Sequence, residues 1–180
     1  MKAVVIYEPS FGSTPAVARA IALGVDRSVK ATLLPASEAD RSILDDADLL
    51  VVGSHSQCWG IAWAGNRGSA ARHVADAPQA PAVGLAAWSQ PGMQEWLSSL
   101  GQVQISAAAF DTRTKGYGIF TVRIAKTICR DLRRHGMTLI VPPASFLVDE
   151  TGQFVPGETL RAEAWGANLG GALRTRRAAV

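Results

Sequence analysis

Short apolar runs alternate along this chain with segments in which apolar residues recur every three or four positions. The runs of aliphatic and β-branched residues predict strands at Lys2–Glu8, Val29–Leu34, Leu49–Gly53, Val83–Ala87, Val103–Phe110 and Met137–Val148. The helical spacing predicts helices at Pro15–Val25, Ser37–Asp45, Ser69–Ala77, Pro91–Leu100, Ile119–Arg134 and Glu158–Leu173. Strands that alternate with helices indicate an α/β protein whose parallel sheet is covered by helices on both faces.

The turn after the first strand is small and rich in hydroxyl groups, Pro9–Thr14, and the helix opens at Pro15. Backbone N–H groups at such a helix N-terminus can bind a phosphate. The turn has neither the Lys of a Walker A loop nor the three glycines of a dinucleotide fingerprint. Two interpretations therefore stay open, a mononucleotide phosphate site and an ordinary strand-to-helix connection.

Two further loops follow predicted strands at the edge where ligands of parallel sheets bind. The first, Ser54–Trp63, carries Trp59 and Trp63 with little charge. These rings either stack on a planar ligand or anchor the loop on a neighbouring helix. The second begins Phe110-Asp111-Thr112-Arg113. Its Asp and Thr either hydrogen-bond a polar heterocycle or cap the following helix.

The order of these segments resembles the flavodoxin family, in particular the single-domain flavodoxin-like proteins of actinobacteria. The segment Phe110–Arg113 is the most specific part of the likeness. The others are Tyr7-Glu8 with Phe11–Thr14, Asp48–Gly53, Gln94–Leu97, Ser145–Val148 and Glu158–Gly166. The resemblance implies one flavodoxin-like domain over residues 1–180. It also implies a doubly wound, five-stranded parallel sheet in the order 2-1-3-4-5, with helices on both faces.

The resemblance further implies FMN, with its phosphate on the first loop and its ring between the other two. Gly12, Ser13 and Thr14 would hold the phosphate, Trp59 would stack on the ring, and Asp111 would meet the pyrimidine edge. The full set of implied cofactor-binding residues is Ser10, Phe11, Gly12, Ser13, Thr14, Ser54, His55, Ser56, Trp59, Gly60, Phe110, Asp111, Thr112 and Arg113.

This chain departs from the family's usual motifs in two of the three loops. Pro9 and Ser13 replace the first Ser and the Asn of Ser-x-x-Gly-Asn-Thr. Pro9 removes both a hydroxyl and an N–H that could reach a phosphate. Gly53-Ser54-His55-Ser56-Gln57 stands where Gly-Gly-Pro-Thr-His is usual, and Gln94 occupies a position that is often Arg.

Composition narrows the class of protein. A hydrophobic content of 48% with 18% charged residues is typical of a folded globule. No apolar run reaches the ~20 residues needed to cross a bilayer, so we expect no membrane span. The two cysteines, Cys58 and Cys129, suggest no disulfide framework and therefore a cytoplasmic location. The three histidines lack metal-ligand spacing, so no metal site is expected.

Charge is concentrated in one segment of the chain. The whole sequence has 18 Lys and Arg against 15 Asp and Glu, and Arg113–Arg134 has only Asp131 to oppose its seven cations: Arg113, Lys115, Arg123, Lys126, Arg130, Arg133 and Arg134. This segment is either a solvated helix face or a surface for an acidic redox partner, an NAD(P)H reductase or a phosphorylated substrate. No nucleic-acid-binding module accompanies the charge. The C-terminal residues Leu173–Val180 are expected to be a frayed helix end.

Three functions are compatible with these patterns. The first is an FMN-binding redox protein that transfers electrons between partner proteins. The second is an FMN-dependent NAD(P)H oxidoreductase acting on a quinone-type acceptor. The third is a flavin-free protein of the same fold that binds another ligand or a partner. Whether the chain is an enzyme is left open by the sequence.

Overall fold

The computed structural model describes residues 1–8, 13–55, 92–115, 124–149 and 153–179. The predicted strand Val83–Ala87 and the predicted helix Ser69–Ala77 lie outside these residues. So do six of the implied cofactor-binding residues: Ser10, Phe11, Gly12, Ser56, Trp59 and Gly60.

A parallel sheet forms the centre of the molecule. Its first four positions, in spatial order, are β2 (Lys30–Pro35), β1 (Lys2–Tyr7), β3 (Leu49–His55) and β4 (Ser106–Thr114). Every residue of β3 is buried, as expected for a strand packed on both faces. The predicted sheet order 2-1-3-4-5 is confirmed, because β5 and β6 together take the fifth position beside β4.

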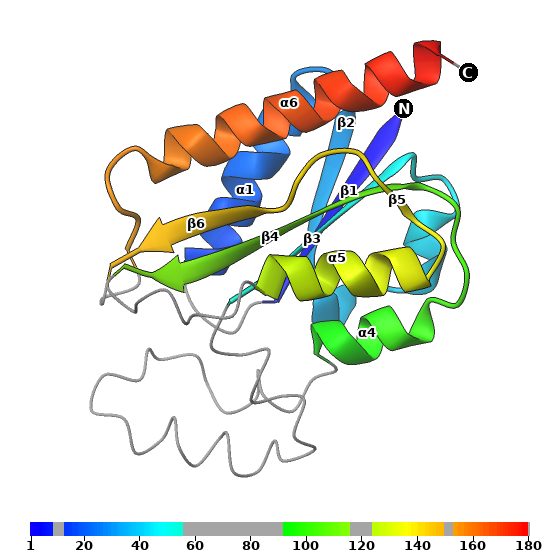
Figure 1. Ribbon diagram of the computed structural model, residues 1–180, viewed down its shortest axis with the longest axis horizontal. Coiled ribbons are helices and arrows are strands. Elements are labelled where there is room, and N and C mark those ends of the chain that lie inside the picture. Colours follow the sequence, from blue (N-terminus) through cyan, green and yellow to red (C-terminus); the bar gives the residue numbers. More distant parts are fainter. Residues whose placement is uncertain (9–12, 56–91, 116–123, 150–152, 180) are drawn as a thin grey trace.

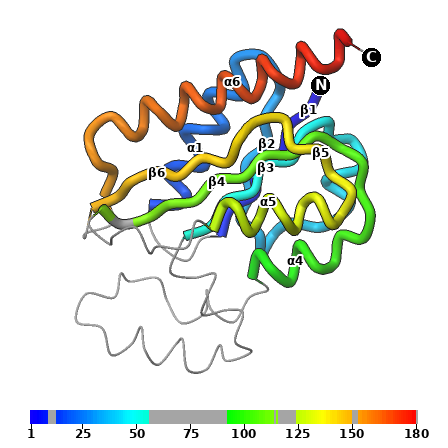
Figure 2. Tube along the Cα trace, viewed as in Figure 1, coloured from blue at the N-terminus to red at the C-terminus, as the bar shows by residue number. Residues whose placement is uncertain are grey.

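The fifth position is split, whereas a single strand over Met137–Val148 was predicted. β5 (Thr138–Leu139) and β6 (Ala144–Val148) run beside β4 in succession (Figure 2). Between the pairs Ala107–Leu139 and Phe110–Ala144, β4 advances three residues while its partner advances five. The break falls at Pro142 and Pro143, which have no N–H to donate to the ladder. The prediction of one strand is therefore wrong at these prolines.

Helices cover both faces of the sheet (Figure 1). α1 (Ser13–Asp26) and α6 (Glu158–Ala178) lie side by side on one face, while α4 (Met93–Ser99) and α5 (Ile124–Arg134) cover the other. α6 continues past Leu173 to Ala178, so the prediction of a frayed end there is wrong. Within the described residues, no helix is long and apolar enough to span a membrane.

The predicted helix Ser37–Asp45 is replaced by two short 3₁₀ turns, η1 (Ala36–Glu38) and η2 (Arg41–Leu44). The carboxylate of Asp40 accepts a hydrogen bond from the Ser42 N–H at 2.9 Å. This local side-chain bond caps a new turn and interrupts the continuous helical ladder. The prediction of one continuous helix over Ser37–Asp45 is therefore wrong.

α1 and α6 pack through glycines that allow their backbones to touch. A Cβ atom on Gly24 would lie 2.0 Å from the carbonyl oxygen of Glu163, and one on Gly166 would lie 2.1 Å from that of Ile21. Neither space accepts a side chain, since real Cβ contacts are far longer than this. The helix pair is therefore held at a distance that only glycine permits at these two positions.

The outer edge of β6 is covered by residues from the segment that leads into α6. The Leu147 N–H donates to Glu158 Oε2 at 2.6 Å, and the Leu147 carbonyl accepts from the Val155 N–H at 3.2 Å. Arg161 donates to the Ser145 carbonyl and to the Glu158 carboxylate. The bond from Arg161 lowers the pKa of Glu158 below its usual value. The backbone groups of this edge are therefore satisfied locally.

Candidate functional site

Buried polar side chains gather where β1, β3 and β4 end. Of the eight polar side chains that the described residues bury, all but Ser106 lie at this carboxyl edge or at the adjoining start of α1. They are Glu8, Ser13, Thr14, Ser54, His55, Asp111 and Thr112. Burying polar groups is costly unless they are paired. Their concentration at one edge therefore marks the candidate site.

A chain of acidic and hydroxyl groups occupies the side of the sheet that faces α4 and α5. Ser54 Oγ donates to Glu8 Oε2 at 2.6 Å. Asp111 is the register neighbour of Ser54 on β4, so its side chain points to the same face. Asp111 Oδ2 accepts from the Ala125 N–H at 2.9 Å. Asp111 thus caps α5, one of the two roles considered for it from the sequence.

Hydroxyl groups occupy the opposite side of the sheet, beneath α1. The hydroxyls of Thr14 and Thr112 are 2.9 Å apart, which ties the first turn of α1 to the end of β4. Ser13 is 3% exposed, and its Oγ has no hydrogen-bond partner among the described residues. The first turn of α1 contains no acidic residue. An orphaned buried hydroxyl at the positive end of a helix is a group arranged for an anion.

His55 ends β3 on this same side, as the register neighbour of Thr112. The residue is 4% exposed. Burial lowers the pKa of His55 to about 4, because the charged imidazolium would lose its hydration. The ring is therefore neutral at pH 7, and it adds a polar group but no charge to the site.

Two more of the predicted cofactor-binding residues, Phe110 and Arg113, have different surroundings in the structure. Phe110 is fully buried, and its ring packs edge-to-face on Phe146 and Trp165. The side chain of Phe110 thus belongs to the core, although the residue lies in the most specific part of the motif. Arg113 lies close enough to Glu158 to lower the pKa of that carboxyl, and its buried Nε has no hydrogen-bond partner among the described residues.

Glu8 is the site residue that sequence reasoning did not single out. It directly follows a buried strand, and that position in a parallel sheet was a usable signal. Its partner Ser54 could not be assigned from sequence, because the pairing depends on the register between β1 and β3.

Several solved structures that are similar to this chain are flavodoxins. A flavodoxin from the domain Archaea superposes with a TM-score of 0.65 at 19% sequence identity, covering 97% of this chain and 99% of that one. A flavodoxin from Streptococcus pneumoniae gives 0.63 at 13% identity, covering 96% and 99%. A short-chain flavodoxin associated with a bacterial microcompartment gives 0.61 at 15%, covering 94% and 97%. The chain has a flavodoxin-like fold.

No protein-family model and no curated protein matches the sequence. The flavodoxin-like fold confirms the resemblance seen in the motifs, while identities below 20% leave ligand and activity to be argued from the residues. The comparison with actinobacterial proteins is not tested by these structures.

Metal binding and cysteine chemistry are two other kinds of chemistry that depend on particular side chains. Within the described residues, no three His, Cys, Asp or Glu side chains converge as metal ligands. Burial raises the pKa of the Cys129 thiol to about 11, although Arg133 opposes this rise. Cys129 therefore stays a protonated core residue, as its apolar helix face predicted.

Proposed function

We propose that this chain binds FMN at the carboxyl edge of its flavodoxin-like sheet and transfers electrons between partner proteins. The observation that carries the proposal is the buried Ser13 Oγ at the N-terminus of α1, which has no hydrogen-bond partner among the described residues. Free N–H groups of the first helical turn and a hydroxyl donor suit the terminal phosphate of a mononucleotide. Thr14 is already oriented beside this position by its contact with Thr112.

The charges of the site agree with a bound phosphate. Glu8 is hydrogen-bonded to Ser54 on the face toward α4 and α5, whereas Ser13 and Thr14 lie on the face toward α1. The two buried acidic groups, Glu8 and Asp111, are thus on the other side of the sheet from the proposed phosphate. Neutral His55 adds no charge of either sign at pH 7.

FMN, when bound, would supply the exchange of one or two electrons that the protein's own side chains cannot perform. This chain's residues would hold the cofactor and keep the site dry. Ser13 and Thr14 would bind the phosphate. Ser56, Trp59 and Gly60 of the second loop lie outside the described residues, and their roles remain those implied by the family resemblance. Asp111 would order the third loop by capping α5.

The decisive measurement is FMN affinity, followed by quenching of flavin fluorescence on titration. We expect Ser13→Ala to weaken binding by about tenfold, since it removes a hydrogen bond to a charged phosphate. Ser28→Ala is the matched control, because Ser28 Oγ is also buried without a partner but lies beyond the other end of α1. Its FMN affinity should equal that of the wild type.

Three results would contradict the proposal. They are a wild-type protein that neither retains a flavin on purification nor binds added FMN, equal weakening in both serine variants, and full affinity in Ser13→Ala. The first would favour the flavin-free alternative. Loss of the flavin's visible absorption on addition of NADPH alone would favour the oxidoreductase over the carrier.

Helix α5 carries the surface that we propose for an acidic redox partner. Its inner face is buried through Ile128 and Leu132. Lys126, Arg130 and Arg133 are exposed on its outer face, three and four residues apart. None of these three has an ion pair with a described residue, whereas Arg134 is bound to Asp131 at 3.0 Å. We refer to Lys126, Arg130 and Arg133 as the α5 stripe. It starts beside the candidate site, since the Ala125 N–H binds Asp111.

Reversing charge in the α5 stripe should weaken partner capture from a host lysate. We expect Lys126→Glu/Arg130→Glu to lose proteins that the wild type retains at low salt. The wild type should lose the same proteins as salt rises, because the screening length is only about 8 Å at 0.15 M. Arg19→Glu/Lys30→Glu makes the same charge change on other exposed positions and should behave like the wild type. Equal losses in both double variants would indicate that the α5 stripe is only a solvated helix face.

A further inference from the structure

An open groove of about 630 Å³ lies at the amino edge of the sheet, at the other end of the strands from the candidate site. It runs between the start of β3, β4 and β5 and the last turns of α6. Its lining includes Asp48, Ser106, Gly136, Thr138, Arg176 and Arg177. From Ser106 to Thr112, β4 rises roughly 20 Å, so this groove is separate from the proposed FMN site.

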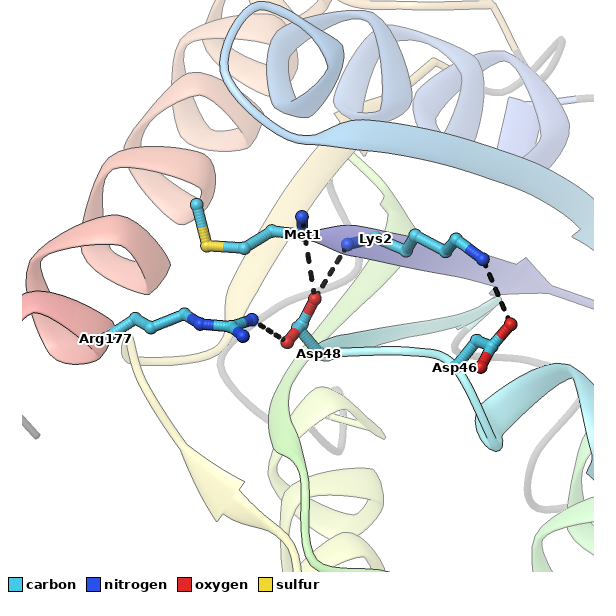
Figure 3. A network of polar contacts seen from close by, with 5 residues as sticks. All are labelled: Met1, Lys2, Asp46, Asp48 and Arg177. Carbon is cyan, nitrogen blue, oxygen red and sulfur yellow. Dashed lines mark hydrogen bonds and ion pairs between the residues drawn. The ribbon is translucent and has the colours of Figure 1, made fainter.

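A network of polar contacts fixes one arginine at the groove (Figure 3). Asp48 Oδ1 is 2.5 Å from Arg177 Nη1, and Asp48 Oδ2 accepts from the Lys2 N–H at 2.8 Å. Both carboxylate oxygens are therefore engaged, and the negative charge of Asp48 is already balanced by Arg177. The remaining charge comes from Arg176, which has no ion pair within the described residues. The groove is thus cationic.

Two hydroxyl groups lie next to each other on the floor of the groove. Ser106 and Thr138 are register neighbours on β4 and β5, so their side chains point to the same face of the sheet. Ser106 is only 8% exposed, and its hydroxyl makes no hydrogen bond with a described residue. Both residues line the cavity, so their hydroxyl groups can donate hydrogen bonds to a ligand there.

We propose that this groove binds a small phosphate-bearing molecule. Guanidinium groups and hydroxyls are the donors that bind phosphate oxygens. The volume falls within the range of small-molecule sites. The paired Asp48–Arg177 holds the Arg177 guanidinium in place, so less side-chain freedom is lost when a ligand binds. This site is independent of FMN and would give the protein a second ligand at the opposite edge of its sheet.

The test is a titration of the full-length protein with inorganic pyrophosphate, followed by the backbone amide resonances in NMR. We expect saturable shifts at Ser106, Gly136 and Thr138. Shifts at Ser13 and Thr14 would report the proposed FMN phosphate site separately, so failure of one proposal is distinguishable from failure of the other. Arg176→Gln should weaken binding at the groove by roughly tenfold, and Ser106→Ala by at least about threefold.

Arg19→Gln is the matched control, because it removes an exposed cation of α1 that has no ion pair with a described residue and does not line the groove. It should change the groove's affinity by less than about twofold. Three results would overturn the proposal: no saturable shifts at the groove, equal weakening by Arg19→Gln and Arg176→Gln, or tighter binding of an acidic peptide than of pyrophosphate with the same dependence on Arg176. The last would assign the groove to a protein partner instead.

Discussion

Replacing Gly166 with alanine is expected to lower the free energy of unfolding by at least about 3 kcal/mol, the upper range for overpacking. The new Cβ would lie 2.1 Å from the Ile21 carbonyl oxygen and 3.0 Å from its Cα. These are backbone atoms of α1, which cannot turn aside as the end of a side chain can. Either α6 must move away from α1 along the whole interface or both helices must distort where Ile21 and Gly166 meet.

Glycines on the same helix provide graded comparisons in urea unfolding. At Gly170 a Cβ would first meet Ser28 Oγ at 2.2 Å, a hydroxyl that can rotate, so Gly170→Ala should cost less. At Gly171 no atom lies within 4 Å. Gly171→Ala should therefore stabilise the protein by up to about 1 kcal/mol, because alanine favours helices. Equal effects at Gly166 and Gly171 would show that the close approach of the helices does not govern stability.

A second large effect is expected when the pH falls. His55 is neutral in the folded protein because burial lowers its pKa to about 4, from an ordinary value of 6.5. Below pH 6.5 the unfolded chain takes up a proton at this residue while the folded protein does not. Stability linked to His55 is thus complete above pH 6.5 and is lost as the pH falls toward 4. Between pH 7 and 4.5 the loss should be about 2.5 kcal/mol.

The variant His55→Gln isolates this contribution, since glutamine is polar but does not titrate. Urea unfolding at pH 7 and pH 4.5 should show a smaller decline in the variant than in the wild type. Glu158 affects both proteins equally. Arg161 lowers its pKa, so its contribution begins to be lost near the ordinary carboxyl pKa of 4.5, in the wild type and in the variant alike. Parallel declines in the two proteins would mean that His55 is charged in the folded state.

The sheet was predictable because its buried strands are continuous apolar runs. The run Leu49–Gly53 is apolar on both faces. It forms most of β3, which lies in the centre of the sheet. The fifth strand was mispredicted because Met137–Val148 has the right residue types but two consecutive prolines inside it. A hydropathy pattern does not show that two backbone N–H donors are missing.

The site was only partly predictable. Ligands of parallel sheets bind at the carboxyl ends of the strands, and this rule predicted the place where the buried polar residues lie. Alternation along β4 could also have assigned Phe110 to the core, since it shares a face with the buried Ala108. The Glu8–Ser54 bond and the orphaned Ser13 hydroxyl depend instead on register and helix placement. Those relationships exist only between segments distant in sequence.

The covered edge of β6 limits how copies of this protein can associate. An exposed strand edge is a template for a strand from another molecule. At β6 the backbone groups that could pair with another strand already bind Glu158, Arg161 and Val155 of the same chain. On β2, at the other side, Asp26 occupies the Ala31 N–H at 2.9 Å and the strand ends in Pro35. On the β6 side, extending the sheet into a second molecule would first require these bonds to break. Fibrillar growth through β6 should therefore begin only after the start of α6 has detached.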